Sequence, residues 1–172
     1  NIEARPVPSF LRGFSAPVQM NFEHSVSDLY FLAQHDQDPF ARWEAVQTLG
    51  VKTCLGFYEA LKRGQRFDLT KEFLQLFGKI ANEKHPDQAY LGFLLAIASE
   101  EYLGQFVTEL QPDLLHQARE QVVRQIAEFN RNLFFSRYME LQRQETGEVS
   151  TAASSRRALK NRLLSMLGRI ND

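Results

Sequence analysis

The sequence predicts an all-α protein, an antiparallel array of helices stacked in pairs like a solenoid, with a short extended N-terminal lead. Apolar residues recur at helical spacing over most of the chain after residue 22. Helix-starting residues and Pro or Gly breaks divide this part into lengths typical of helices. Three of the six prolines fall within residues 6–17, where they exclude a helix and favour extended backbone.

The domain boundary is expected at residue 22. Residues 1–22, the lead segment, should be extended, with a strand around residues 14–22 that finds no pairing strand within this chain. Residues 23–172 should form the helical domain.

The first two predicted helices lie close together in the chain. Ser25, with Asp28 three residues later, predicts a cap for a helix over 26–35 whose apolar face begins with Leu29, Phe31 and Leu32. Asp38-Pro39 predicts a second start, and Gly64 should end that helix. Its apolar face is expected to contain Trp43, Val46, Gly50, Cys54, Phe57 and Leu61.

Shorter helices should follow. One is predicted over 70–82, and the His-Pro pair at 85–86 forces a break before another over 87–97. Ser99 should cap a fifth helix. The two glutamates that follow it would lie in the first turn, where negative charge interacts favourably with the helix dipole.

The longest predicted helix covers 112–144, because neither Gly nor Pro interrupts it after Pro112. At 1.5 Å per residue it would be a rod of roughly 50 Å. A Ser/Thr-rich loop over 146–155 and a last helix over 155–168 should follow. No fixed-period sequence repeat accompanies this order of helices.

Composition excludes several classes of protein. A net charge of −1 gives no field that would attract nucleic acid or anionic lipid, and no apolar run is long enough to cross a membrane. One cysteine, Cys54, excludes an internal disulfide, and no signal peptide is recognisable, so we expect a cytoplasmic protein. The chain begins at Asn1 rather than Met and ends on a helical pattern, so we expect a fragment of a longer polypeptide.

Three blocks of residues resemble one enzyme family and occur in that family's order. The first runs from Arg5 to Val18. The second comprises Phe31-Leu32, His35-Asp36, Asp38, Phe40, Arg42, Trp43, Glu44, Ala45, Gln47 and Leu49. The third comprises Arg156-Arg157-Ala158-Leu159-Lys160-Asn161 with Leu164, Ser165 and Leu167. Together they resemble the bacterial-type aminopeptidase N (alanyl aminopeptidase) family of zinc metallopeptidases; Arg162 departs from the pattern, where an apolar residue is expected.

The resemblance implies a parent hydrolase with a β-rich domain, a thermolysin-like catalytic domain, a small β-sandwich and a C-terminal helical domain. The lead segment would be the last strand of the sandwich, and residues 23–172 the first part of the helical domain. The parent would use zinc to remove N-terminal residues from peptides in peptide catabolism, with the helical domain helping to enclose the active-site cavity. The partners would be the remaining domains of the same polypeptide and peptide substrates, with no nucleic acid and no membrane.

The chemistry of such enzymes is missing from this sequence. A zinc helix needs H-E-x-x-H, yet His24, His35, His85 and His116 include no pair at ligand spacing. The G-A-M-E-N type motif by which the family holds a substrate's amino end is also absent. We therefore expect no catalytic, cofactor-binding or metal-binding residue here, and no activity from this segment alone.

The remaining candidates each have a structural interpretation that we favour. His35-Asp36 could be a base with its orienting carboxylate, but adjacent helical residues point about 100° apart, which favours a helix-end role. Cys54 could be a nucleophile, but its place on an apolar stripe favours packing. Trp43, flanked by Arg42 and Glu44, should be a buried anchor of the first helix pair.

The last helix is basic through Arg156, Arg157, Lys160, Arg162 and Arg169. These residues could contact phosphate, but the neutral overall charge favours a solvated or internally paired face. A different function also fits the helical content, namely a stand-alone helical scaffold that presents a groove to a partner protein. The proline-rich lead segment favours the enzyme segment, because a scaffold has no use for a strand without a partner.

Overall fold

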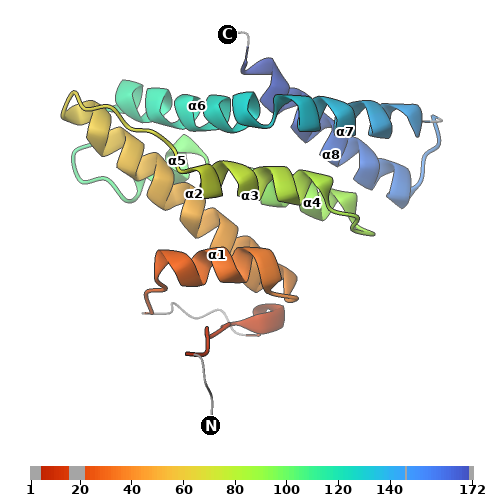
Figure 1. The fold of residues 1–172 in the computed structure, drawn as a ribbon, viewed down its shortest axis with the longest axis horizontal. Coiled ribbons are helices and arrows are strands. Elements are labelled where there is room, and N and C mark those ends of the chain that lie inside the picture. Colours follow the sequence, from red (N-terminus) through yellow and green to blue (C-terminus); the bar gives the residue numbers. More distant parts are fainter. Residues whose placement is uncertain (1–4, 16–21, 146, 171–172) are drawn as a thin grey trace. The chain divides into compact units, whose positions relative to one another are not determined.

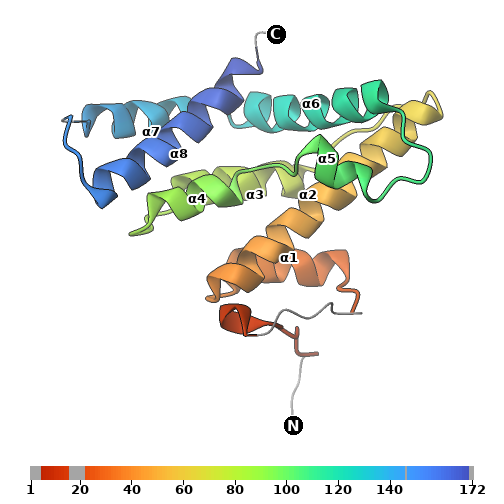
Figure 2. The same cartoon turned by 180° about the vertical axis from the view of Figure 1, so that it is seen from behind.

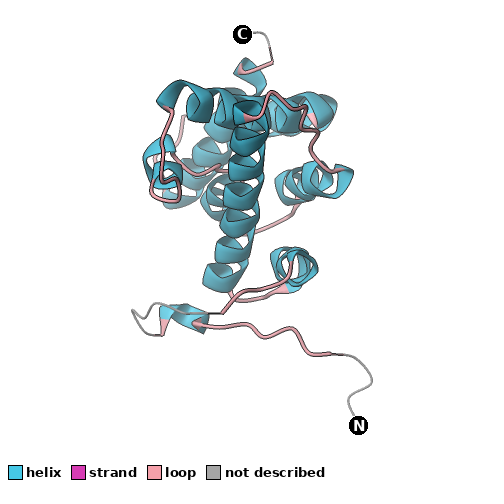
Figure 3. Ribbon diagram, turned by 90° about the vertical axis from the view of Figure 1, so that its left-hand side faces the viewer, coloured by secondary structure: helices cyan, strands magenta, loops and turns pink. Residues whose placement is uncertain are grey.

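Helices are the only regular structure in residues 5–15, 22–145 and 147–170, the part of the chain that the computed structural model describes (Figure 3). In chain order they are η1 (Arg12–Phe14), α1 (Val26–His35), α2 (Pro39–Lys62), α3 (Lys71–Asn82), α4 (Gln88–Leu94), α5 (Glu100–Gly104), α6 (Pro112–Phe129), α7 (Arg131–Arg143) and α8 (Thr151–Gly168). The predicted all-α class is confirmed. Most of the strand expected around residues 14–22 falls outside the described residues.

The chain divides into two compact units, Asn1–Gly50 and Val51–Asp172, and each is described separately. The predicted boundary at residue 22 is a different division and stays a prediction.

In the first unit, side-chain caps start both helices as predicted. Ser25 Oγ accepts a hydrogen bond from Asp28 N at 3.1 Å, and Asp38 caps α2. The Arg42 guanidinium donates to Ala33 O at 2.9 Å and so joins α2 to α1. The core of this unit is formed by Leu29, Leu32, Ala33, Ala41, Ala45, Val46 and Leu49.

Two aromatic side chains predicted to face inward lie outward instead. Phe31 is 52% exposed, and Trp43, the predicted anchor, is 38% exposed. The buried face of early α2 repeats at Ala41, Ala45 and Leu49, and a residue two positions after Ala41 lies about 200° round the helix from it. The predicted stripe holds further along, where Val46 and Cys54 are buried.

The second unit stacks antiparallel helix pairs. Figures 1 and 2 show α7 and α8 running in opposite directions on either side of a short loop, with α3 and α4 forming a second pair. Helix α8 packs against α4, α6 and α7, and α3 packs against α4, α6 and α7. This arrangement confirms the predicted array of stacked pairs. Gly64, with φ of +62°, follows the end of α2 as expected.

The predicted 112–144 rod is wrong, because it breaks at Asn130 into α6 and α7. Asn130 has φ −101° and ψ 11°, and its side chain is buried. Asn130 Nδ2 donates to Leu74 O at 2.9 Å and to Ile126 O at 3.0 Å. The amide therefore fixes the bend against α3. This tertiary contact could not be predicted, because no Gly or Pro marks the break in the sequence.

Two helix boundaries differ from the predicted ones. Helix α8 begins at Thr151 rather than 155, because Ser150 Oγ accepts from Ala153 N at 3.2 Å and caps it. Helix α4 ends at Leu94, three residues before the predicted end. In the described part of the chain, no helix is both long enough and apolar enough to cross a membrane.

Candidate functional site

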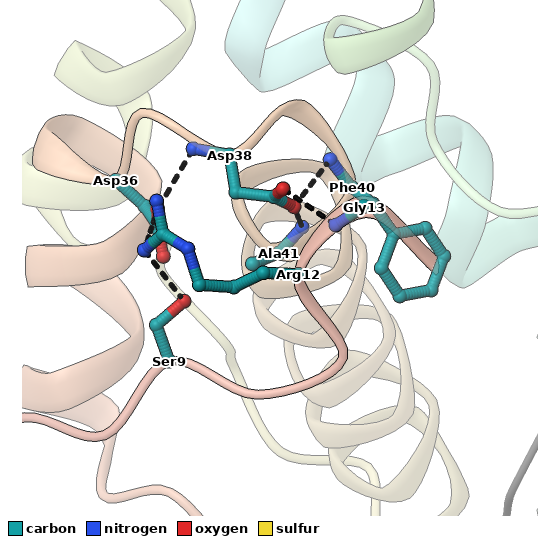
Figure 4. Close-up of polar contacts among 7 residues, drawn as sticks. All are labelled: Ser9, Arg12, Gly13, Asp36, Asp38, Phe40 and Ala41. Atoms are coloured by element: carbon teal, nitrogen blue, oxygen red, sulfur yellow. Dashed lines mark hydrogen bonds and ion pairs between the residues drawn. The ribbon is translucent and has the colours of Figure 1, made fainter. Parts of the chain in front are cut away.

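A cluster of polar contacts in the first unit joins the lead segment to the start of the helical array (Figure 4). We call it the Asp38 junction, and it comprises Ser9, Arg12, Gly13, Asp36, Asp38, Phe40 and Ala41. Asp38 Oδ1 accepts from Phe40 N at 3.1 Å and Ala41 N at 2.9 Å, which caps α2. Asp38 Oδ2 accepts from Gly13 N at 2.7 Å. A single carboxylate thus starts a helix and holds the lead segment.

Asp36 provides the second half of the junction. Its Oδ1 accepts from Asp38 N at 2.9 Å and from Arg12 Nη1 at 3.2 Å, and Arg12 also contacts Ser9 Oγ at 3.4 Å. The Asp36 side chain is only 2% exposed. Its carboxylate serves the end of α1 and the lead segment, while the His35 ring lies 5.0 Å from that of Phe31. The helix-end interpretation of His35-Asp36 is supported over the base dyad.

Backbone geometry turns the lead segment toward Asp38. Leu11 and Gly13 both have positive φ, 51° and 64°, on either side of Arg12. Positive φ is strained for leucine and natural for glycine, so this turn is held by its contacts. Arg5 Nη2 contacts Asp28 Oδ2 at 3.5 Å and forms a second tie from the lead segment to α1.

Electrostatics favour the ionised form of Asp38. Hydrogen bonds from the backbone N–H groups of Ala41 and Gly13, with the nearby Arg12 charge, hold the pKa of Asp38 below its usual value of 3.8. The junction offers anchoring chemistry, since its acids are committed to helix caps and an arginine. Nothing in it combines a nucleophile with a base.

Cys54 lies in the core of the second unit and is fully buried. Burial raises the pKa of the Cys54 thiol to about 12, with the Arg119 charge acting in the opposite direction. A thiol this reluctant to ionise is a poor nucleophile. The packing interpretation of Cys54 is supported.

A cluster of Glu100, His116 and Glu120 was missed at the sequence level. Their possible ligand atoms lie within 4.8 Å of one another, and His116 Nδ1 is 2.9 Å from Glu100 Oε1. Arg119 and Arg169 each contact Glu120 at 2.9 Å. Two guanidinium groups on one carboxylate oppose a metal cation, so the cluster is better described as an ion-pair network joining α5, α6 and α8. The spacing of His116 and Glu120 was the available signal, but Glu100 reaches them only through the fold.

The basic residues of α8 are mostly paired within the protein. Arg157 and Lys160 both contact Glu145 at 3.1 Å, and Arg169 contacts Glu120. Arg162, the departure from the family pattern, donates from Nε to Gly92 O at 3.3 Å, and burial lowers its pKa. The internally paired interpretation is thus supported for these four residues. Arg156 is the exception, since no ion pair involves it within the described residues.

Fold and junction together define a domain of stacked helices that is fixed at its start to a lead segment containing only the short helix η1 among its described residues. A family model described as "Domain of unknown function (DUF3458_C) ARM repeats" matches residues 26–172. The chain belongs to this ARM-repeat family.

Three curated relatives of the chain share one name. The chain is 33% identical to "Aminopeptidase N" of Caulobacter vibrioides over 94% of its length, and 25% identical to that of Haemophilus influenzae over 99%. It is 28% identical to that of Escherichia coli over 74% of its length. These matches confirm the resemblance to the aminopeptidase N family.

The chain spans about a fifth of these relatives, 18% of the first, 19% of the second and 15% of the third. A solved structure, that of Legionella pneumophila aminopeptidase A in complex with aspartic acid, matches 99% of this chain with 20% of its own. The TM-score is 0.81 at 24% identity, which shows a shared fold.

Proposed function

We propose that this chain is a non-catalytic segment of a zinc-dependent aminopeptidase, in which the helical domain helps to enclose the active-site cavity. The observation that carries the proposal is the match of 94% of the chain to a relative named "Aminopeptidase N". The missing H-E-x-x-H motif supports the non-catalytic part. The zinc and the peptide substrates belong to the proposed parent.

Two features of the chain suit this role. The Asp38 junction fixes the first residues of the array to the lead segment, as a connection between domains requires. The stacked pairs of the second unit could form part of a wall, and a walled chamber would admit flexible peptides while excluding folded proteins. The cytoplasmic setting predicted from the lone cysteine stays a prediction.

The test compares the 172-residue chain with the full-length polypeptide that contains it. Alanine p-nitroanilide should be hydrolysed only by the full-length protein, with activity lost in chelator and restored by zinc. The full-length protein should also shorten a flexible peptide but spare a folded protein with the same N-terminal residues.

Each arm can fail separately. Zinc-dependent hydrolysis by the 172-residue chain alone would overturn the non-catalytic assignment. A full-length protein that stays inactive with zinc would overturn the enzyme assignment and favour the scaffold alternative. Equal attack on folded and flexible substrates would remove the enclosing role only.

A further inference from the structure

A polar pocket of about 430 Å³ lies in the second unit, between the α3–α4 turn, α7 and the start of α8. The ionisable side chains that line it are those of Lys84, His85, Arg137, Glu140 and Arg156. Three of these are permanent cations at neutral pH, against one carboxylate. In a chain whose net charge is −1, this concentration of positive charge is local to the pocket.

Arg137 is the buried centre of the lining. Its side chain is only 10% exposed, and it donates from Nη1 to Glu140 Oε2 at 2.6 Å and from Nη2 to Gln88 Oε1 at 2.8 Å. The third nitrogen of the guanidinium, Nε, is buried and has no hydrogen-bond partner among the described residues. Buried donors are rarely left unpaired in native proteins, so we expect a water molecule or a ligand oxygen to complete the hydrogen bonding of this arginine.

Arg156 adds a positive charge that forms no ion pair with the described residues. Its neighbours Arg157 and Lys160 share Glu145, whereas the described residues offer Arg156 no ion pair. Ala152, one turn earlier on α8, also lines the pocket, near the start of an 18-residue helix. The positive end of the helix dipole therefore adds to the guanidinium charge.

The pocket walls are held in place by contacts between distant parts of the chain. Ser155 Oγ donates to Asp87 Oδ1 at 2.8 Å and accepts from Ala89 N at 2.8 Å, which joins α8 to the start of α4. Gln88 Nε2 donates to His85 O at 2.6 Å, so the amide that orients Arg137 is itself fixed. A preorganised set of donors loses little entropy when a ligand binds.

We infer that this pocket binds an oxyanion, the phosphate or carboxylate group of a small molecule. Guanidinium groups match the planar and tetrahedral oxygen arrangements of these ions, and a helix start favours negative charge. Arg156 is the primary ligand-binding residue, Lys84 supports it by charge, and Arg137 positions the pocket floor. The inference stands independently of the enzymatic role of the parent.

The test is a titration of the 172-residue chain followed by NMR, with the Arg137 Nε–H and Ala152 N–H signals as reporters. The probes are potassium phosphate and N-acetylglycine. Potassium chloride at matched ionic strength and the uncharged N-acetylglycinamide are the controls. We expect saturable shifts with one or both probes, with a Kd on the order of 1 mM, and no saturable shift with either control.

Variants connect the binding to the pocket. Arg156→Gln should weaken binding about tenfold, the value expected for a lost charge-assisted contact. Arg143→Gln removes the same charge from an exposed position on α7 that does not line the pocket, and it should leave the Kd unchanged. Lys84→Gln should weaken binding by a smaller factor, and it tests the pocket independently because Lys84 lies outside α8.

The outcomes separate cleanly. Tighter binding of phosphate identifies a phosphate site, and tighter binding of N-acetylglycine identifies a carboxylate site; both support the inference. Absence of saturable shifts, equal shifts with chloride, or unchanged affinity in both Arg156→Gln and Lys84→Gln would overturn it.

Discussion

Gly78 of α3 lies directly against the Asn130 side chain at the α6–α7 bend. A Cβ added at Gly78 would overlap Asn130 Oδ1, and Leu133 lies just beyond. Asn130 cannot retreat without giving up its hydrogen bonds to Leu74 O and Ile126 O. Glycine is required at this position because there is no room for a Cβ. Its backbone is helical and would itself accept other residues.

This contact predicts a strong coupling between two substitutions. Gly78→Ala should lower the free energy of unfolding by about 1–3 kcal/mol, because the new methyl group overpacks a buried site. In the background of Asn130→Ala the obstructing amide is gone, so the same change should cost much less. Urea denaturation of the four proteins in a double-mutant cycle measures the difference.

Gly168→Ala is the matched control for this cycle. Gly168 ends α8, and apart from its chain neighbours and the backbone of its own helix, no atom of the described residues lies within 4 Å of the Cβ that alanine would add. Alanine is the better helix former, so this change should be neutral or stabilise by up to about 1 kcal/mol. Additive costs for Gly78→Ala and Asn130→Ala would refute the steric account.

Among the helices, starts were predictable wherever the signal is local. Ser25, Asp38 and Ser99 each cap the helix that follows within three residues, so the sequence contains the whole interaction. The Asn130 break depends on Leu74, 56 residues away, and it was missed for that reason. Ser150 was missed because a Ser/Thr-rich stretch resembles a loop until one hydroxyl is known to cap.

The cap of α2 predicts the effect of changing Asp38. Asp38→Ala removes the acceptor for Phe40 N and Ala41 N and should lower the free energy of unfolding by about 1 kcal/mol, within the 0.5–2 kcal/mol range of lost caps. Asp38→Asn keeps a capping oxygen and should cost less. Chemical denaturation at neutral pH checks both.

Asp68→Asn serves as the control for these variants. Asp68 is exposed and contacts only Arg66 among the described residues, at 3.0 Å, a type of surface pair that contributes little. A loss for Asp38→Ala no larger than that for Asp68→Asn would contradict the capping role.

For the whole molecule, the architecture was predictable and the polar sites were not. Helical periodicity and caps give the all-α array, because burial of apolar faces follows spacing along each helix. The Asp38 junction, the Glu100 cluster and the Arg137 pocket each join residues far apart in the sequence. Nothing in the sequence distinguishes Arg12, Arg137 and Arg156 from the other arginines until the fold shows their neighbours.

The charges of the whole chain predict sensitivity to acid. Four carboxyl groups have a lowered pKa, through the Ser25 hydroxyl, the Ala41 N–H, the Ser155 hydroxyl and the Lys160 ammonium respectively: Asp28, Asp38, Asp87 and Glu145. A carboxyl whose folded pKa is depressed contributes stability that is present above its unfolded pKa and lost as the pH falls through the folded value. The ordinary values here are 3.8 for Asp and 4.5 for Glu.

The free energy of unfolding should therefore fall as the pH is lowered from about 5 toward 2. Glu145→Gln should make the fall shallower, because the variant has no proton to take up at this position. Glu44→Gln, an exposed change of equal charge beyond the first turn of α2, should leave the slope as it is. Urea denaturation at a series of pH values gives both slopes, and identical slopes for the Glu145→Gln variant and the unaltered chain would contradict the assignment.

The two oxygens of Asp38 create a thermodynamic linkage between neighbouring segments. One oxygen binds the first amides of α2, and the other binds Gly13 N of the lead segment. Ordering of the lead segment therefore stabilises the first turn of α2, and by reciprocity fraying of that turn loosens the lead segment. A force that pulls the lead segment away from Asp38 would therefore also weaken the first turn of α2, because both depend on the same carboxylate.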